Sequence, residues 1–178
     1  MLLLAHVGIT LGASCCLVRF WKWRGLENYA NAVDYRLVLL GAVLPDIIDK
    51  PLGGLILRES LGNGRIYSHT LAFLLVLFTA GVILQRKLNR PGLLVIGGGV
   101  AAHYVLDGMW FSPANLFWPL YGWSFPKGNP EGWMQLWLNN LLSNPLVFVP
   151  EIAGGLILLC FLVKFYGKGE KKTVQHNN

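Results

Sequence analysis

Charged residues are scarce in this chain of 178 residues, because Asp, Glu, Lys and Arg together make up 13% of it. An ordinary soluble domain is about one quarter charged, whereas 54% of this chain is hydrophobic. A disordered chain is excluded too, since it needs few apolar residues and many charged ones. The composition therefore indicates an integral membrane protein rather than a secreted, fibrous or disordered one.

Cysteine is also rare, with three residues at Cys15, Cys16 and Cys160. They form neither an even disulfide framework nor a CxxC pair for zinc, so we expect small apolar fillers of membrane helices. The formal net charge is +6, but the Lys and Arg residues lie in the joints between apolar runs. This distribution is a topology signal rather than a phosphate-binding face, and no nucleic-acid partner is expected.

The chain has five long apolar runs, which cover residues 2–18, 37–57, 70–84, 92–111 and 145–163. Their lengths suit membrane spans, since about 20 helical residues cross about 30 Å of hydrocarbon. The sequence thus predicts an all-α, polytopic transmembrane helical bundle of about five spans. We expect one domain over residues 1–166 and a polar cytoplasmic tail over residues 167–178. The first run lacks basic residues ahead of it, which favours a retained span over a cleaved signal peptide.

The distribution of basic residues predicts the orientation of the bundle. With five spans, residues 19–36, 86–90 and 164–172 share one side and contain most of the Lys and Arg residues. The opposite side receives only Arg58, Arg65 and Lys127. The positive-inside rule then places the N-terminus outside and the C-terminus in the cytoplasm of a bacterial or archaeal cytoplasmic membrane.

Three segments depart from a uniform apolar helix. The second run contains Pro45 and Pro51, so we expect a broken span whose irregular backbone faces protein or water. Glycines at positions 97–99 predict close helix packing, because no lysine follows them to make a phosphate loop. The joint over residues 111–144 is rich in aromatic residues, which is typical of an interfacial segment, here on the outer surface.

Ionisable residues interrupt or open the apolar runs at His6, Asp46, Asp49, His69, His103, Asp107 and Glu151. Each costs up to about 2.5 to 3.5 kcal/mol, the value near the centre of a bilayer, so the uncompensated set would cost on the order of 15 kcal/mol, comparable to the stability of a domain. Something must neutralise them together. Glu151 follows Pro150 in a first turn and is expected to be structural.

Depth and spacing bring the other six residues together. With ~1.5 Å of rise per residue, several helices place them in one layer between the midplane and the outer surface. The pairs His103/Asp107 and Asp46/Asp49 are four and three residues apart, so each lies on one helix face. Taken singly, each residue could be a packed histidine, a helix cap or half of an ion pair. Jointly, converging imidazoles and carboxylates predict a divalent-metal site, which would suit one or two zinc ions.

Four motifs occur in order along these runs: an early His6, Leu44-Pro45-Asp46 with Asp49, Arg65 ahead of Ser68-His69-Thr70, and His103 ahead of Leu106-Asp107. Together they resemble the YdjM family of membrane-bound, metal-dependent hydrolases over roughly residues 1–120. Gly64 stands where the family often has a histidine, and Ser-His-Thr replaces its usual Thr-His-Ser. The ligand types are also similar, more distantly, to the all-helical zinc phospholipase C and P1 nuclease group. The resemblance implies a hydrolase without supplying a substrate.

The predicted function is metal-dependent hydrolysis of a phosphoester or other ester bond of a lipid at the outer leaflet. Its predicted ligands are His6, Asp46, Asp49, His69, His103 and Asp107. Asp49 is expected as a further ligand or as the general base, and Arg65 as a phosphate clamp or a headgroup contact. Membrane lipids and a lipid-like substrate are the expected partners, and the oligomeric state is left open.

Two other functions fit the same residues. A divalent-metal or proton transporter would use intramembrane His and Asp equally well, but it favours polar residues on both sides of the midplane and often an internal repeat. The sequence has no such repeat, and its cytoplasmic halves are apolar. A noncatalytic scaffold with structural zinc would instead have a closed site without an open coordination position.

Overall fold

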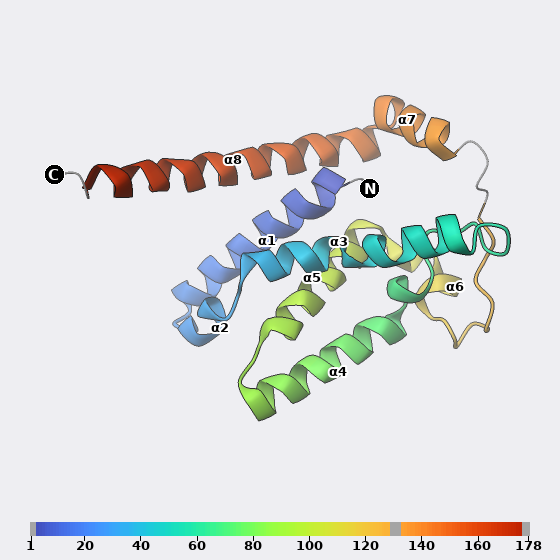
Figure 1. Ribbon diagram of the computed structural model, residues 1–178, viewed down its shortest axis with the longest axis horizontal. Helices are drawn as coiled ribbons and strands as arrows, with labels where there is room; N and C mark the ends of the chain where they lie inside the picture. The colour runs from blue at the N-terminus through green and yellow to red at the C-terminus, as the bar shows by residue number, and fades with distance from the viewer. Residues whose placement is uncertain (1–2, 129–132, 176–178) are drawn as a thin grey trace.

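The computed structural model describes residues 3–128 and 133–175, and within these ranges the chain contains helices and turns but no strands (Figure 1). The all-α class is therefore confirmed for this part of the chain. The α-helices are α1 Leu3–Trp23, α2 Glu27–Asn31, α3 Tyr35–Pro51, α4 Leu71–Leu88, α5 Gly92–Leu106, α6 Pro113–Leu116, α7 Trp133–Ser143 and α8 Pro145–Gln175. Shorter turns join them, namely the π-helical η1 Leu52–Ile56 and the 3-10 turns η2 Tyr67–His69 and η3 Met109–Phe111.

Among the described residues, three helices are long and apolar enough to cross a membrane: α1, α4 and the Pro145–Lys164 part of α8. α5 is also apolar but has 15 residues, which is short for a span. α3 has 17 residues, among them two aspartates and a lysine in its last two turns. The structure thus has three candidate spans and a shorter apolar helix, where the sequence predicted about five spans.

The second run is broken as predicted, but only after Pro51 and not at Pro45. α3 continues through Pro45 to Pro51, and irregular helix begins only at η1. A proline inside a helix removes a hydrogen bond to the residue four positions before it, here Gly41. Close packing compensates at that point, because a Cβ on Gly41 would lie 2.2 Å from the carbonyl oxygen of Ile96 on α5. Asp46 and Asp49 therefore project from regular helix.

Small residues let the central helices approach each other. α3 packs against both α1 and α5, while α8 lies along α1 and α4 along α5 (Figure 1). A Cβ on Gly8 would lie 2.1 Å from the carbonyl oxygen of Gly154, and one on Gly99 would lie 2.6 Å from that of Val38. A Cβ on Gly97 would lie 3.2 Å from the Phe78 ring. The prediction of close packing is confirmed for Gly97 and Gly99.

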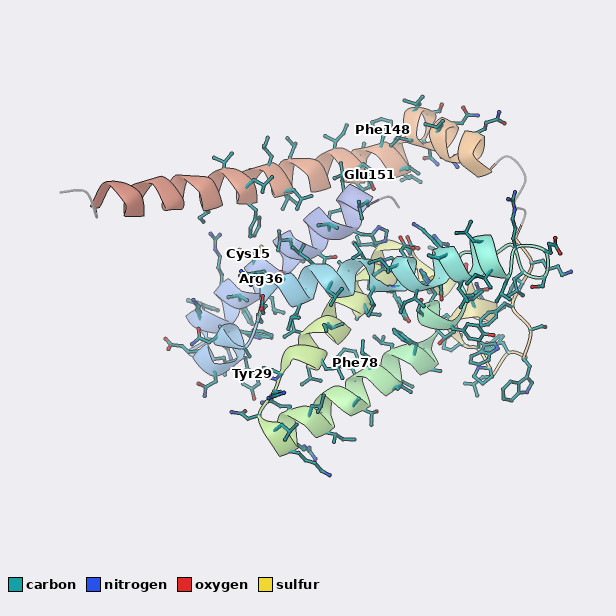
Figure 2. The ribbon with its side chains drawn as sticks, in the orientation of Figure 1. Cys15, Tyr29, Arg36, Phe78, Phe148 and Glu151 are labelled. Atoms are coloured by element: carbon teal, nitrogen blue, oxygen red, sulfur yellow. The ribbon has the colours of Figure 1, made fainter. Side chains whose placement is uncertain are left out.

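Glu151 has a structural contact, although not in its own helix. It lies six positions after Pro145, the first residue of α8, and points towards the N-terminal end of α1 (Figure 2). Its Oε2 accepts a hydrogen bond from the Leu4 backbone N–H at 3.0 Å, and the residue is 7% exposed. The first N–H groups of a helix have no partner within the helix. Glu151 therefore caps α1, the helix that carries His6.

The aromatic joint folds back over the turn that precedes α4. The Tyr67 ring in η2 lies edge-on to the rings of Trp118 and Phe125, with centroids 5.6 and 5.0 Å away. The Gly128 N–H donates to the Leu61 carbonyl oxygen at 2.8 Å. This packing fixes the turn that ends at His69. An interfacial position of the joint stays a prediction.

α8 continues to Gln175, so residues 167–175, which the sequence assigned to a separate polar tail, lie in the same helix as the apolar run. In the part of the chain that the structure describes, Cys15, Cys16 and Cys160 are free thiols.

We expect Gly99→Ala to destabilise the protein by about 1 to 3 kcal/mol, the usual effect of overpacking, because the added methyl would clash with the α3 backbone. Gly98→Ala is the matched control, since a Cβ there meets no described atom within 4 Å. Thermal unfolding of detergent-purified variants measures the difference. Equal melting temperatures for the two variants would contradict the close contact between α3 and α5.

Candidate metal centre

The six predicted ligands come together where α1 begins and where α3 and α5 end. His6 is in the first turns of α1, Asp46 and Asp49 are near the end of α3, His69 ends η2, and His103 and Asp107 are at the end of α5. The three histidines are at most 1% exposed. The cluster therefore lies inside the protein, at one end of its three central helices.

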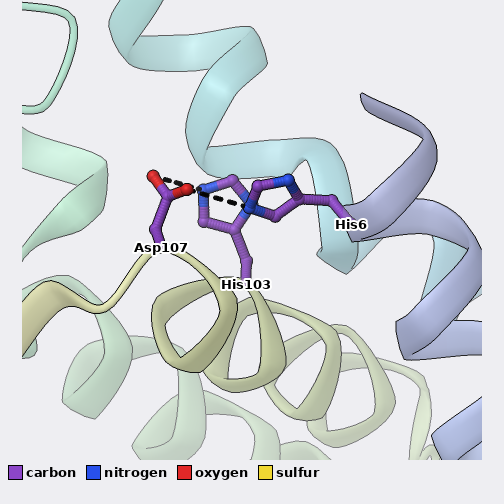
Figure 3. A group of neighbouring side chains, drawn as sticks. All are labelled: His6, His103 and Asp107. Atoms are coloured by element: carbon purple, nitrogen blue, oxygen red, sulfur yellow. Dashed lines mark ion pairs between the residues drawn. The ribbon is translucent and has the colours of Figure 1, made fainter. Parts of the chain in front are cut away.

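One group within this cluster consists of His6, His103 and Asp107 (Figure 3). The His6 Nε2 lies 3.1 Å from Asp107 Oδ1, and the His103 Nε2 lies 3.9 Å from Asp107 Oδ2. The two imidazole rings have centroids 4.2 Å apart. One nitrogen or oxygen atom from each residue lies within 4.8 Å of the others, so the three could hold one metal ion.

A second group consists of Asp46, His69 and His103. The Asp46 Oδ1 lies 3.7 Å from His69 Nε2 and 4.0 Å from His103 Nε2. The Nε2 atoms of the two histidines are 3.2 Å apart. Since His103 belongs to both groups, the two form one continuous cluster rather than separate sites.

The outer nitrogens of His69 and His103 are committed to other partners. The His103 Nδ1 lies 2.8 Å from the Ala42 carbonyl oxygen, which can only accept, so this nitrogen carries the proton. The His69 Nδ1 lies 2.7 Å from Asp49 Oδ2, a carboxylate that also accepts backbone N–H groups from Ile66 and Ser68. The tautomers inferred from these partners leave the Nε2 lone pairs of both histidines facing each other.

Two facing lone pairs at 3.2 Å repel each other unless a proton or a cation lies between them. Tetrahedral zinc ligands at about 2.0 to 2.1 Å from the ion lie about 3.3 to 3.4 Å from one another. The separation of the two Nε2 atoms, and the 3.1 Å between His6 Nε2 and Asp107 Oδ1, are close to this value. Imidazole and carboxylate donors also suit zinc chemically. The residues therefore fit a divalent cation.

Asp49 is placed differently from Asp46, although both were predicted as ligands. Its side chain is fully buried, and its two oxygens accept hydrogen bonds from Ile66, Ser68 and His69. It is in neither group that could hold a metal. A carboxylate that accepts the second N–H of a ligating histidine fixes the ring and raises its basicity. The geometry thus favours an orienting role for Asp49.

Both carboxylates near the histidines also contact a cation at the mouth of the site. The Asp107 Oδ2 lies 2.8 Å from Arg65 Nη2, and the Asp46 Oδ2 lies 2.6 Å from Lys50 Nζ. The Arg65 and Lys50 side chains are 39% and 60% exposed. Each aspartate thus has an oxygen near the buried imidazoles and an oxygen near an exposed basic side chain, which offsets its negative charge.

The sequence did not single out three residues that hold the site together. Ser68 donates through its hydroxyl to the Pro45 carbonyl oxygen at 2.8 Å, and Tyr104 donates to the carbonyl oxygens of Ser68 and Thr70. Both contacts fix η2 against α3 and α5. Lys50 is the third, and its position four residues after Asp46 was the available signal. For Tyr104 the signal was a hydroxyl inside an apolar run, which needs a partner when buried.

We expect Asp49→Asn to weaken zinc binding by about 10- to 100-fold, because it removes the negative charge that orients and polarises His69. Competition with a chromophoric zinc chelator on the detergent-purified protein measures the affinity. Asp34→Asn is the control, since Asp34 is a carboxylate that caps α3 through the Arg36 N–H, away from the cluster. Wild-type affinity in Asp49→Asn would exclude the orienting role.

Comparison with known proteins agrees with the motifs. A family model described as YdjM inner membrane protein matches residues 1–171, a range that includes every residue of the His/Asp cluster. No curated protein and no solved structure matches the chain. The resemblance that the sequence motifs indicated is confirmed. With buried His/Asp groups that could hold a metal ion and with candidate membrane spans in the same chain, the protein belongs to the YdjM inner membrane protein family.

Proposed function

We propose that this protein is a membrane-embedded hydrolase that uses zinc to cleave a phosphoester or other ester bond of a lipid. The observation that carries the proposal is the pair of Nε2 atoms of His69 and His103, 3.2 Å apart with both Nδ1 atoms hydrogen-bonded elsewhere. A structural ion pair would not need three buried histidines at this spacing. A cation-binding site does.

We assign the ligand role to His6, His69, His103, Asp46 and Asp107. His103 is common to both groups, and its Nε2 has a single lone pair. It can therefore bind only one ion, which supports one zinc shared by both groups over two separate ions. The chemistry supplied by a divalent cation at such a donor set is polarisation of a phosphoryl or carbonyl oxygen and a more acidic water.

The protein's own residues would orient the lipid and move the proton. Arg65 is exposed at the mouth and can donate two parallel hydrogen bonds to a phosphate, with Lys50 as a second positive charge. Asp49 is fully buried and its oxygens already accept three donors, so it is unsuited to be the general base. Asp46, whose side chain is 21% exposed, would hold the ion through Oδ1 and use its outer oxygen, Oδ2, to accept a proton from the attacking water. The water oxygen then bonds to phosphorus or to the carbonyl carbon, the bond from that atom to the lipid ester oxygen breaks, and the ester oxygen leaves with the proton that Asp46 accepted.

We infer that the site opens to the outer leaflet. The cluster lies where α1 begins, whereas the basic residues in the last turns of α1 and α4, Lys22 with Arg86 and Lys87, lie at the other ends of these helices. The positive-inside rule assigns those basic ends to the cytoplasm. In this arrangement α3 and α5 cross between the longer helices as shorter inner spans, which would give the five spans that the sequence predicts.

The transporter alternative has less support. A transporter needs a polar route on both sides of its binding site. In the described structure, the space beside the cluster towards the basic ends is lined by apolar and aromatic side chains apart from Thr10 and Ser14. The side of the cluster towards the basic ends of α1 and α4 is therefore mainly apolar, which supports a hydrolase over a transporter.

Hydrolysis of defined lipids tests the proposal. Wild-type protein in mixed micelles should release phosphate from phosphatidic acid, or an acid or alcohol from related phosphodiester and carboxyl-ester lipids. His103→Ala should reduce the rate to background, and a chelator should do the same reversibly, whereas Asp34→Asn should keep the wild-type rate. Hydrolysis that survives both the loss of His103 and the chelator would contradict the mechanism. Zinc uptake into proteoliposomes without any hydrolysis would support the transporter.

Arg65 gives a more specific test of headgroup binding. We expect Arg65→Ala to raise KM at least about tenfold for a lipid with an anionic phosphate, because a charge-assisted hydrogen bond is lost. The KM for a neutral carboxyl-ester lipid should change less. Arg58→Ala is the control, because Arg58 is exposed on the same side and lies outside the cluster. Equal effects on both lipid classes would show that Arg65 acts only through Asp107.

A further inference from the structure

A cavity of about 400 Å³ lies among α1, α2, α3 and α5. Its lining is mainly apolar and includes Thr10, Val38, Gly98, Gly99 and Ala102. The volume is within the range of about 300 to 1,000 Å³ that is typical of small-ligand pockets. The lining helices include a candidate membrane span and the apolar helix α5, so the cavity is a hydrocarbon-like space inside the bundle.

The cavity lies one helical turn from the metal centre on three helices at once. On α1, Thr10 lines it four residues after His6. On α5, Gly99 lines it four residues before His103. On α3, Val38 lines it four residues before Ala42, whose carbonyl oxygen holds His103. Residues four apart share a helix face and are separated by about 5.4 Å along the axis.

Thr10 is an unpaired polar group in this apolar lining. The residue is 4% exposed, and its Oγ1 has no hydrogen-bond partner among the described residues. A buried hydroxyl without a partner is destabilising, so its presence points to a ligand with a polar atom at this position. Because Thr10 is one turn from His6, that polar atom would lie at the end of the cavity nearest to the metal centre.

We propose that this cavity binds one hydrocarbon chain of the lipid substrate. The Thr10 hydroxyl would form a hydrogen bond with the polar group that links this chain to the rest of the lipid. The inference rests on the proposed function and deepens it, because it identifies the substrate as a lipid whose chain extends inward from its reacting headgroup. A partner helix does not fit. An α-helix is about 10 Å across with its side chains, and ten residues of it are about 15 Å long. A helix of that length occupies more volume than the cavity has.

Gly98 offers a way to fill the cavity without disturbing the bundle. It lines the cavity, and a Cβ added to it meets no described atom within 4 Å. Gly98→Leu therefore places its side chain where the lipid chain would lie. Gly155→Leu is the matched control on α8, because Gly155 is outside the cavity and a Cβ there meets only the Leu4 side chain, at 3.7 Å.

The experiment uses the full-length protein in detergent with a phosphatidic acid that carries a diazirine in its acyl chain. After illumination, mass spectrometry of peptides should locate the label on the cavity residues of α1 and α5. We expect Gly98→Leu to reduce this labelling at least about tenfold, and Thr10→Val to weaken probe affinity about fivefold, as for one lost hydrogen bond. Gly155→Leu should label like the wild type, and melting curves confirm that each variant is folded.

Labelling that is unchanged in Gly98→Leu, or that lies on the exposed face of α4 instead, would overturn the proposal. The readout does not need turnover, so the two proposals can fail separately. Cavity labelling in a protein that hydrolyses no lipid would leave the binding site intact and remove the hydrolase. Hydrolysis without labelling of the cavity would support the hydrolase and exclude the cavity as the binding site of the chain.

Discussion

The rest of the structure depends on two imidazole nitrogens that face each other inside the bundle. The Nε2 atoms of His69 and His103 are 3.2 Å apart, and neither ring can turn away, because Asp49 holds one Nδ1 and the Ala42 carbonyl oxygen holds the other. Such a pair is stable only when a positive charge lies between the nitrogens. The surrounding carboxylates and histidine supply the further donors that a divalent ion would need.

The scaffold explains how so many polar groups remain inside an apolar protein. Glycines bring the backbones of α3 and α5 into contact, which places the Ala42 carbonyl oxygen beside His103. Ser68 and Tyr104 attach the η2 turn to both helices. Asp46 and Asp107 each contact an exposed basic side chain. The cost of burial is thus offset pairwise by these basic side chains, and a shared cation inside would offset it further.

Much of the candidate site could be predicted from the sequence, because an ionisable residue in an apolar run is expensive and several of them need a common reason. The different roles of Asp46 and Asp49 could not be predicted from the sequence. They share one helix face, and only the tertiary position of η2 determines which of them meets the backbone of Ile66 and Ser68. The helix through Pro45 was also missed, because packing against α5 outweighs the local penalty of proline. The hydrogen-bond partners of the buried Tyr104 hydroxyl could not be identified from the sequence, because they depend on how α5 packs against η2.

The most direct test of a cation at the two facing histidines is the metal content of detergent-purified protein, measured by plasma mass spectrometry for the wild type, His103→Ala and Asp46→Ala. Asp34→Ala serves as a carboxylate control outside the cluster. The account predicts near-stoichiometric metal in the wild type and in the control, loss of the metal in His103→Ala, and loss or strong reduction in Asp46→Ala. A folded wild-type protein that was never exposed to a chelator and contains no metal, or a His103→Ala variant that keeps it, would contradict the account.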